Sequence, residues 1–387
     1  MSANETSGEC LEVSEIGEEN VASVESIISL YFIPFVCVLG ILGNVVNLII
    51  LTRQRFQKAL GKLQEAANVC LIAMAISDLM FCVLAFLTMI VPADRIFPDR
   101  GFVFQYGRYA HGLINIFIME STLLTVTMSL ERFIPICYPL QQTLYLKKGL
   151  IKRIIVSTFI FSIVFNIPVM FRFQPVVICA FSSSIDSTGA SFNYTGNISA
   201  ILTTTGPLHS TPSPRVISSI RYSLNTVPLC GSTAVDTAYR ITWAFVGNFL
   251  PLIFLVFFNV RMYRQIMSSH KKRLAFDCEE TMSMSSYILT LTLLAIVLMF
   301  LVLVAPSETV LFLMQMSNSK NLPAVEAVLN LMQTINFSFN FFLYAIISPY
   351  FRDTIRYWYV KVHINTLFRI EYYVYDYKNE FKTSLMH

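Results

Sequence analysis

Seven long apolar segments dominate this chain and restrict its fold more than any other feature. Crossing hydrocarbon about 30 Å thick takes roughly 20 apolar residues in a helix, and each segment meets that length. Only 13% of the residues are charged, against roughly 25% in a soluble domain, which indicates lipid as the solvent. Because backbone amides in lipid must pair within their own segment, we expect an all-α bundle of seven membrane-spanning helices. The segments cover about residues 27–52, 65–92, 102–136, 150–172, 238–264, 284–316 and 323–349.

Charges are divided unevenly between the two ends of these segments. Residues 1–52 contain seven glutamates and no Lys or Arg, whereas basic residues cluster after the first, third, fifth and seventh segments. By the positive-inside rule the N-terminus lies outside and the C-terminus in the cytosol. The basic clusters adjoin the spans, so they indicate the bilayer as a partner and not nucleic acid. The predicted parts are an acidic outer tail (1–26), a membrane domain (27–349), an amphipathic surface helix (350–362) and a cytosolic tail (363–387).

The longest connection, about residues 175–236, joins the fourth and fifth spans and is expected to lie outside. Asn4, Asn193 and Asn197 begin glycosylation sequons on that predicted outer side. Only cysteines facing the oxidising exterior form stable disulfides. Cys179 and Cys230 would join the two ends of the long loop, and Cys10 is a competing partner. No cleavable signal peptide is recognisable, so the first span is expected to act as an anchor.

Polar and charged residues inside apolar segments are costly and therefore informative. Asn44 and Asp78 lie in the first and second spans, and Glu131-Arg132-Phe133 ends the third. The later spans carry Pro168, Pro251, Pro306 and the run Asn340-Phe-Phe-Leu-Tyr344.

In this order and at these separations, these residues resemble the motifs of rhodopsin-family (class A) G-protein-coupled receptors over roughly residues 27–362. The resemblance implies a multi-pass plasma-membrane receptor that binds an extracellular ligand and activates a heterotrimeric G-protein. No His-Glu-x-x-His or Walker motif is present, so an enzyme is not predicted. A transporter or channel, the alternative from another class, predicts inverted repeats or rings of charge along a pore, and the sequence has neither.

The resemblance also assigns an activation switch. In that family the residue matching Glu131 pairs with Arg132 at rest, and Arg132 turns toward the G-protein in the active state. Phe133 completes the motif. Asn340 and Tyr344 match the seventh-span motif, where the tyrosine swings inward to hold the open form.

A polar cluster around Asp78 is the second implied site. Asn44, Ser121, Asn336 and Asn340 match the family's cluster positions, which can hold Na⁺. Oxygen ligands suit a hard cation, so a sodium site is expected. A hydrogen-bonded packing cluster without an ion is the alternative, and no other metal or cofactor is predicted.

Glu308 follows Pro306 on the outer half of the sixth span and is the main candidate for ligand recognition. A buried carboxylate there favours a cationic ligand group, whereas the alternative is a polar contact between helices. Glu120, halfway along the third span, is expected to face a neighbouring helix. The candidate pocket residues are His111, Asn115, Glu308, Glu326 and Gln333.

The class of ligand follows partly from exclusion. Ile114 stands where amine receptors have Asp, and residues 323–349 lack the Lys that an opsin needs. The seventh-span motif and the run Phe258–Arg264 resemble invertebrate FMRFamide-type neuropeptide receptors. An Arg-Phe-amide peptide would offer its guanidinium to Glu308 or Glu326. A non-peptide ligand and a receptor-like protein without signalling remain alternatives.

Four positions depart from the family pattern. Gly107 replaces the cysteine at the outer end of the third span, and Val304 replaces the sixth-span tryptophan. Asn259 replaces a fifth-span tyrosine, and Phe341 replaces the proline of the seventh-span motif. These changes bear on how ligand binding is transmitted and not on the fold.

Overall fold

The computed structural model describes residues 24–53, 62–91, 96–138, 148–182, 216–276, 284–316, 323–347, 351–357 and 360. They fall into two compact units, which we describe separately. One unit includes Val91–Arg108 and Phe173–Thr226. The other includes Val21–Ile90, Tyr109–Arg172 and Val227–His387.

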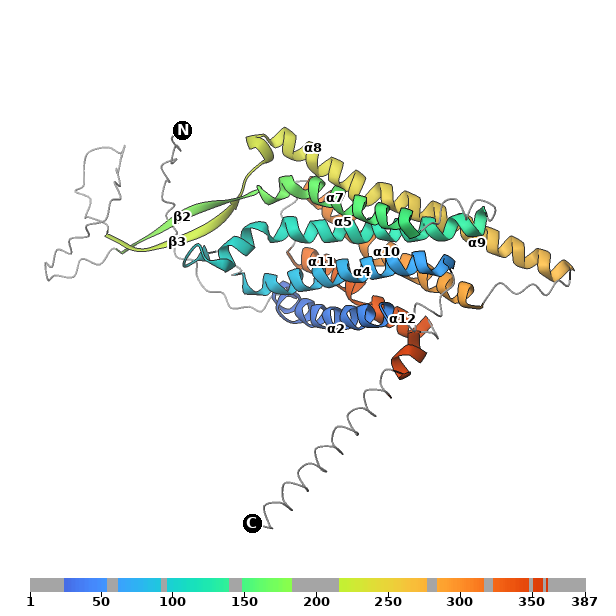
Figure 1. Ribbon diagram of the computed structural model, residues 1–387. Helices are drawn as coiled ribbons and strands as arrows, with labels where there is room; N and C mark the ends of the chain where they lie inside the picture. The colour runs from blue at the N-terminus through green and yellow to red at the C-terminus, as the bar shows by residue number, and fades with distance from the viewer. Residues whose placement is uncertain are drawn as a thin grey trace, which may run out of the picture. The chain divides into compact units, whose positions relative to one another are not determined.

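The second unit is helical (Figure 1). Its helices begin with α1 (Val24–Ile27), η1 (Ile28–Phe32), α2 (Ile33–Leu51), α4 (Lys62–Leu87), η2 (Thr88–Ile90), α5 (Phe102–Cys137, whose first turns belong to the other unit) and α7 (Lys148–Met170). They continue with η4 (Leu229–Gly231), α8 (Thr233–Ala244), the π-helical turn η5 (Phe245–Phe249), α9 (Leu250–Phe276), α10 (Met284–Met316), α11 (Pro323–Ser338) and α12 (Asn340–Ile347). Residues 351–357 form a further helical segment, which is the described part of the predicted surface helix 350–362.

Six helical runs of the described chain are long and apolar enough to cross a membrane: Val24–Leu51, Ala67–Ile90, Phe102–Cys137, Gly149–Met170, Thr233–Ser268 and Leu294–Met314. Large apolar side chains such as Phe35 and Val164 are at least 60% exposed, whereas Asn44 and Asp78 are completely buried. This distribution reverses that of a soluble protein and fits a bundle surrounded by lipid. The predicted all-α membrane bundle is confirmed.

The seventh predicted span consists of two consecutive helices, α11 and α12, instead of one continuous helix. Phe339 separates them, although its N–H still donates to Ile335 O at 3.0 Å and its carbonyl accepts from Leu343 at 3.3 Å. The interruption faces two glycines of α2. A Cβ on Gly40 would lie 2.9 Å from Ser338 Cβ of α11, and one on Gly43 would lie 2.9 Å from Phe341 Cβ of α12. Glycine at both positions therefore lets α2 approach the interrupted helix closely.

The main apolar core of the helical unit lies between α2, α4, α5, α10 and α12. Leu51, Met74, Leu124 and Tyr344 are buried in it, and Phe351 packs beside Tyr344 with ring centroids 5.7 Å apart. Phe351 thereby holds the short helical segment 351–357 against the bundle.

The other unit contains a three-stranded antiparallel sheet in the order β1-β3-β2. Its strands are β1 (Ile96–Phe97), β2 (Phe173–Ser182) and β3 (Val216–Thr226). β2 and β3 pair from Phe173↔Thr226 to Ser182↔Val216, with one irregularity between Ala180 and Phe181. The two ends of the long predicted loop thus form a ribbon (Figure 1).

An apolar cluster attaches this sheet to the first turns of α5. Phe97, Phe104, Phe173 and Leu224 are buried together, and Phe97 packs edge-on against Phe104 at 5.3 Å. A Cβ on Gly107 would lie 3.3 Å from both Leu224 Cδ1 and Phe97 Cζ. Apolar side chains therefore contact the position at which the family has its disulfide cysteine.

The predicted disulfide between Cys179 and Cys230 is not present, because Cys230 is an exposed free thiol. Cys179 is in β2, paired with Ile220, and its side chain lies outside the described residues. Cys230 has φ 54°, a left-handed conformation that few non-glycine residues adopt. Also outside the described residues are Asn4, Asn193, Asn197, Cys10, most of the predicted tails and the middle of the long loop.

Candidate functional site

Asp78 is the centre of a buried hydrogen-bond cluster that joins three predicted spans. Its Oδ1 accepts from Ser121 Oγ of α5 at 2.7 Å, and its Oδ2 accepts from Asn340 Nδ2 of α12 at 2.5 Å. Both partners were predicted from the sequence. A completely buried carboxylate requires such donors, because unpaired burial of a charge is very costly.

The remaining predicted members of that cluster have other roles in the structure. Asn44 donates to the main-chain oxygen of Phe337 at 3.0 Å and accepts from Asn47 at 3.4 Å. It therefore ties α2 to α11 two residues before the interruption. Asn336 is buried on α11, at 8% exposure. In this arrangement Asn340 presents its amide nitrogen to Asp78, so a cation that bound the carboxylate would have to replace one of its two donors, Ser121 or Asn340.

Glu131 and Arg132 are both 2% exposed near the end of α5. Within the described residues, neither Glu131 carboxylate oxygen has a hydrogen-bond partner, nor do Nε and Nη2 of Arg132. The resting Glu131–Arg132 pair that the resemblance implies is not among the ion pairs of the described chain. Buried donors without partners are costly, which indicates that another arrangement of Arg132 would be favoured once an acceptor becomes available.

Phe133 has a packing role in the structure. Its ring lies 5.1 Å from that of Phe258 and 6.0 Å from that of Phe257, between α5 and α9. Directly after Phe258, Asn259 donates to Leu255 O at 2.7 Å and to Ser129 Oγ at 3.5 Å, and Ser129 lies one turn before Phe133 on α5. These contacts fix α9 against the segment of α5 that carries Arg132.

Glu308 of α10 accepts a short hydrogen bond from the side-chain amide of Gln333 of α11. Both residues are buried, at 9% and 5% exposure. An amide donor solvates the carboxylate but does not neutralise its charge. His111 is exposed and Asn115 half-buried on α5, while Glu326 is exposed in the first turn of α11. Of the predicted pocket residues, Glu308 and Gln333 contact each other.

Glu120 faces α7, as the sequence predicted. Its oxygens accept from Thr158 Oγ1 at 3.1 Å and from Ser162 Oγ at 3.2 Å. Further along α7, Asn166 accepts from the indole N–H of Trp243 of α8 at 3.1 Å. The sequence analysis missed Asn166 and Trp243, although a lone Asn and a lone Trp within apolar spans were available as signals.

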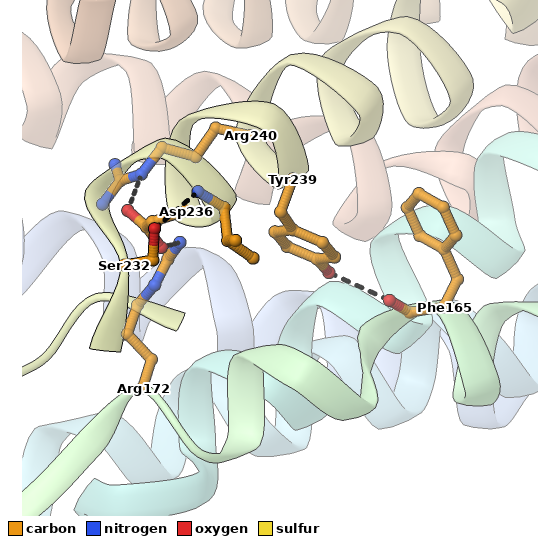
Figure 2. A network of polar contacts seen from close by, with 7 residues as sticks. Phe165, Arg172, Ser232, Asp236, Tyr239 and Arg240 are labelled. Carbon is orange, nitrogen blue, oxygen red and sulfur yellow. Dashed lines mark hydrogen bonds and ion pairs between the residues drawn. The ribbon is translucent and has the colours of Figure 1, made fainter. Parts of the chain in front are cut away.

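A second set of contacts between α7 and α8 includes charged groups (Figure 2). Asp236 accepts from Arg172 at 2.5 Å and from Arg240 at 2.8 Å, and Tyr239 donates to Phe165 O at 2.9 Å. The spacing 236, 239 and 240 places these side chains on one face of α8. The start of α8 is therefore fixed to the end of α7.

Val304 occupies the place of the family's sixth-span tryptophan. It is 1% exposed and packs with Leu255, Val297 and Phe300 in an apolar cluster between α9 and α10. The position therefore holds a compact apolar contact and no large ring.

Apolar helices around a buried Asp78 cluster, with Glu131 and Arg132 buried near the end of α5, are the arrangement expected of a seven-helix membrane receptor. Residues 43–210 match the family model described as 7 transmembrane receptor (rhodopsin family). The chain is similar to that family over this range, which is less than half of its 387 residues. It is similar to the FMRFamide receptor of Drosophila melanogaster, with 24% identity over 318 residues. The alignment covers 80% of this chain and 49% of the relative, so the chain spans about half the length of that receptor.

Proposed function

We propose that this chain is a plasma-membrane receptor for an amidated neuropeptide and that it activates a heterotrimeric G-protein. The N-terminus faces outward and the C-terminus the cytosol, in keeping with the segregation of basic residues. The distant likeness to an FMRFamide receptor supports a peptide with an Arg-Phe-amide end.

The observation that carries the ligand proposal is the buried Glu308 carboxylate with its Gln333 amide partner. Gln333 supplies a neutral donor, and within the described residues no Lys, Arg or His forms an ion pair with Glu308, so an ionised Glu308 would need a cation from elsewhere. A ligand guanidinium would supply that cation and form a bidentate, charge-assisted pair with the carboxylate. Gln333 fixes the orientation of Glu308 for this contact.

Activation follows as a shift between two populations of the receptor. The agonist binds the open form more tightly, α10 moves, and the cytosolic end of the bundle opens. Arg132, whose Nε and Nη2 have no partner in the described chain, then donates to the G-protein. Tyr344, which is 4% exposed beside Phe351, swings inward and supports this open form.

The oxygens around Asp78 would hold a sodium ion in the resting form. Asp78 and the oxygens of Ser121 and Asn340 would be its protein ligands, with the side chain of Asn340 turned so that its oxygen faces the ion. The ion supplies the positive charge that a buried carboxylate otherwise lacks.

A binding experiment that neutralises each charge in turn tests the ligand proposal. Synthetic Phe-Met-Arg-Phe-amide and the same peptide with citrulline in place of Arg are compared on wild-type receptor and on Glu308→Gln. Loss of a charge-assisted hydrogen bond costs about 1.5–3 kcal/mol, so either single change should weaken binding by about 10- to 150-fold.

The combined change should cost little more than either change alone, because both remove the same contact. Glu326→Gln is measured beside Glu308→Gln, because Glu326 is the other carboxylate that could receive the guanidinium, and Asp353→Asn, at an exposed carboxylate outside the candidate pocket, is the control that should bind as wild type does. Additive losses in the double change would show that Glu308 does not contact the ligand arginine. Silence of the wild-type receptor toward all amidated peptides would favour a non-peptide ligand or a receptor without signalling.

A further inference from the structure

Glu120 is a buried carboxyl group that neither the ligand site nor the Arg132 region uses. It is 3% exposed in the middle of α5, and both of its oxygens contact hydroxyl groups of α7. Within the described residues, no Lys, Arg or His forms an ion pair with it. An ionised carboxylate at this depth would therefore have only neutral partners, which compensate poorly for its desolvation.

A count of protons distinguishes the two charge states of this group. Thr158 has one hydroxyl proton but two acceptors within reach, Ile155 O at 2.9 Å and Glu120 Oε1 at 3.1 Å. Ser162 has one hydroxyl proton, directed at Glu120 Oε2. With Glu120 ionised, two donors face three acceptors. With Glu120 protonated on Oε1, the acid donates to Thr158, Thr158 donates to Ile155 O, and Ser162 donates to Oε2, so every group is satisfied.

The same face of α7 continues the polar contacts to α8. Asn166 is 0% exposed, and its Nδ2 donates to Ser162 O at 2.9 Å and lies 3.7 Å from Met119 Sδ. Its Oδ1 accepts from Trp243 Nε1. Trp243 precedes the π-helical turn Phe245–Phe249, in which a Cβ on Gly247 would lie 3.1 Å from Met119 Cε. Of two neighbouring residues of α5, Met119 thus lies beside η5, and Glu120 contacts α7.

We propose that Glu120 is a positioning residue: a neutral carboxylic acid that holds α7 to α5 and, through Asn166 and Trp243, holds α8 to the same body. The three helices then behave as one rigid half of the bundle, against which α10 moves. The role of this rigid half in signalling rests on the proposed function. The protonation of Glu120 and its contacts do not.

The protonation state is tested by infrared spectroscopy of the purified receptor. The C=O stretching band of protonated carboxyl groups should lose one component in Glu120→Gln and keep it in Glu326→Gln, the exposed control. A band unchanged by Glu120→Gln would overturn the neutral acid.

The positioning role is tested by paired substitutions. A glutamine retains one donor and one acceptor in the same geometry, whereas a leucine retains neither. Glu120→Gln should therefore keep the apparent Tm and the response to Phe-Met-Arg-Phe-amide near wild type. Glu120→Leu should lower the Tm and weaken the peptide response about tenfold, as loss of one buried hydrogen bond predicts. Equal damage by both variants, or none by Glu120→Leu, would contradict the proposal.

A double-mutant cycle tests whether the contacts form one network. Trp243→Phe keeps an aromatic ring but removes the donor to Asn166. Trp243→Phe should lower the Tm less in the Glu120→Leu variant than in the wild-type receptor, because Glu120→Leu already breaks the same network. Strictly additive Tm losses would show that the Glu120 and Trp243 contacts are independent. A wild-type receptor that shows no G-protein activation would refute the proposed function, but the infrared and Tm measurements would still decide the role of Glu120.

Discussion

The side-chain amide of Asn340 donates a 2.5 Å hydrogen bond to the carboxylate of Asp78, and the two residues are 262 positions apart in the chain. Asn340 is the first residue of α12, directly after the interruption at Phe339. The bond therefore fixes the start of α12 to α4, and Ser121 extends the link to α5. A rearrangement of the seventh span must break or remake this contact, so changes at Asp78 should alter how easily α12 moves.

Removal of the Asp78 carboxylate should destabilise the bundle. Asp78→Ala leaves the amide of Asn340 and the hydroxyl of Ser121 without their acceptor, at a cost of about 1–3 kcal/mol for each buried group. Asp78→Asn keeps one acceptor oxygen and should cost less. Thermal unfolding of purified receptor measures both, and equal Tm values for wild type and Asp78→Ala would contradict the contact.

Sodium should stabilise the wild-type receptor through the same residue. If the oxygens around Asp78 bind Na⁺, the Tm rises as NaCl replaces choline chloride at constant ionic strength, because an ion bound only by the folded state shifts the equilibrium. Asp78→Asn should abolish the rise. A Na⁺ effect that persists in this variant would exclude Asp78 as a ligand and leave a packing cluster.

Glycine at position 40 should be required for the packing of α2 on the seventh span. An added Cβ would lie 2.5 Å from Cys82 Sγ and 2.9 Å from Ser338 Cβ, so Gly40→Ala should cost about 1–3 kcal/mol through overpacking. Gly149→Ala is the matched control, since nothing lies within 4 Å of its Cβ. Its Tm should equal that of wild type or exceed it slightly, because alanine favours helix over glycine. Equal Tm losses in both variants would exclude a close approach at Gly40.

The apolar cluster should hold the sheet to the start of α5 without a covalent bond. Phe97→Ala removes a buried ring from it, a change that typically costs about 3–5 kcal/mol. Hydrogen exchange of the β3 amides should accelerate strongly in this variant. Arg100→Ala removes only a cation placed 4.8 Å from the Tyr222 ring, worth about 0.5–1 kcal/mol at an exposed site, and should accelerate exchange far less. Unchanged exchange in Phe97→Ala would show that something else attaches the sheet.

Asp236 should contribute a salt-dependent share of the contact between α7 and α8. Its two arginine partners are partly exposed, with side chains 16% and 32% accessible, so the pairs are screened by solvent. Asp236→Asn should lower the Tm at low salt, and the difference from wild type should shrink at high salt. A difference independent of salt would indicate lost packing instead of lost ion pairs.

Much of this architecture could be predicted from the sequence, because lipid imposes strong rules. The length of the apolar segments predicted the helices, and the resemblance to the receptor family implied a cluster of Asn44, Asp78, Ser121, Asn336 and Asn340. The structure shows hydrogen bonds from Ser121 and Asn340 to Asp78. Glu120 was also correctly expected to face a neighbouring helix. Such predictions succeed because a polar group buried in lipid must find a partner on another helix.

Other features depended on three-dimensional packing that no pattern in a single sequence reveals. The interruption at Phe339 was not predicted, since no proline or glycine marks it. The proposed disulfide of Cys230 was wrong, because the spacing of cysteines says nothing of their geometry. The partnership of Trp243 with Asn166 depends on how α7 and α8 lie together, and each residue alone is also compatible with simple packing.

Nucleotide exchange on a purified heterotrimeric G-protein tests most directly whether this chain is a peptide receptor that activates a G-protein. Receptor in lipid nanodiscs is mixed with the G-protein and synthetic Phe-Met-Arg-Phe-amide, and uptake of GTPγS is followed. We predict that the peptide accelerates uptake with wild type, that Arg132→Ala abolishes the acceleration, and that Glu308→Gln shifts it to higher peptide concentration. Folded wild-type receptor that leaves GTPγS uptake unchanged would show that this peptide does not activate the G-protein through the chain. Uptake that Arg132→Ala still accelerates would show that Arg132 is not required.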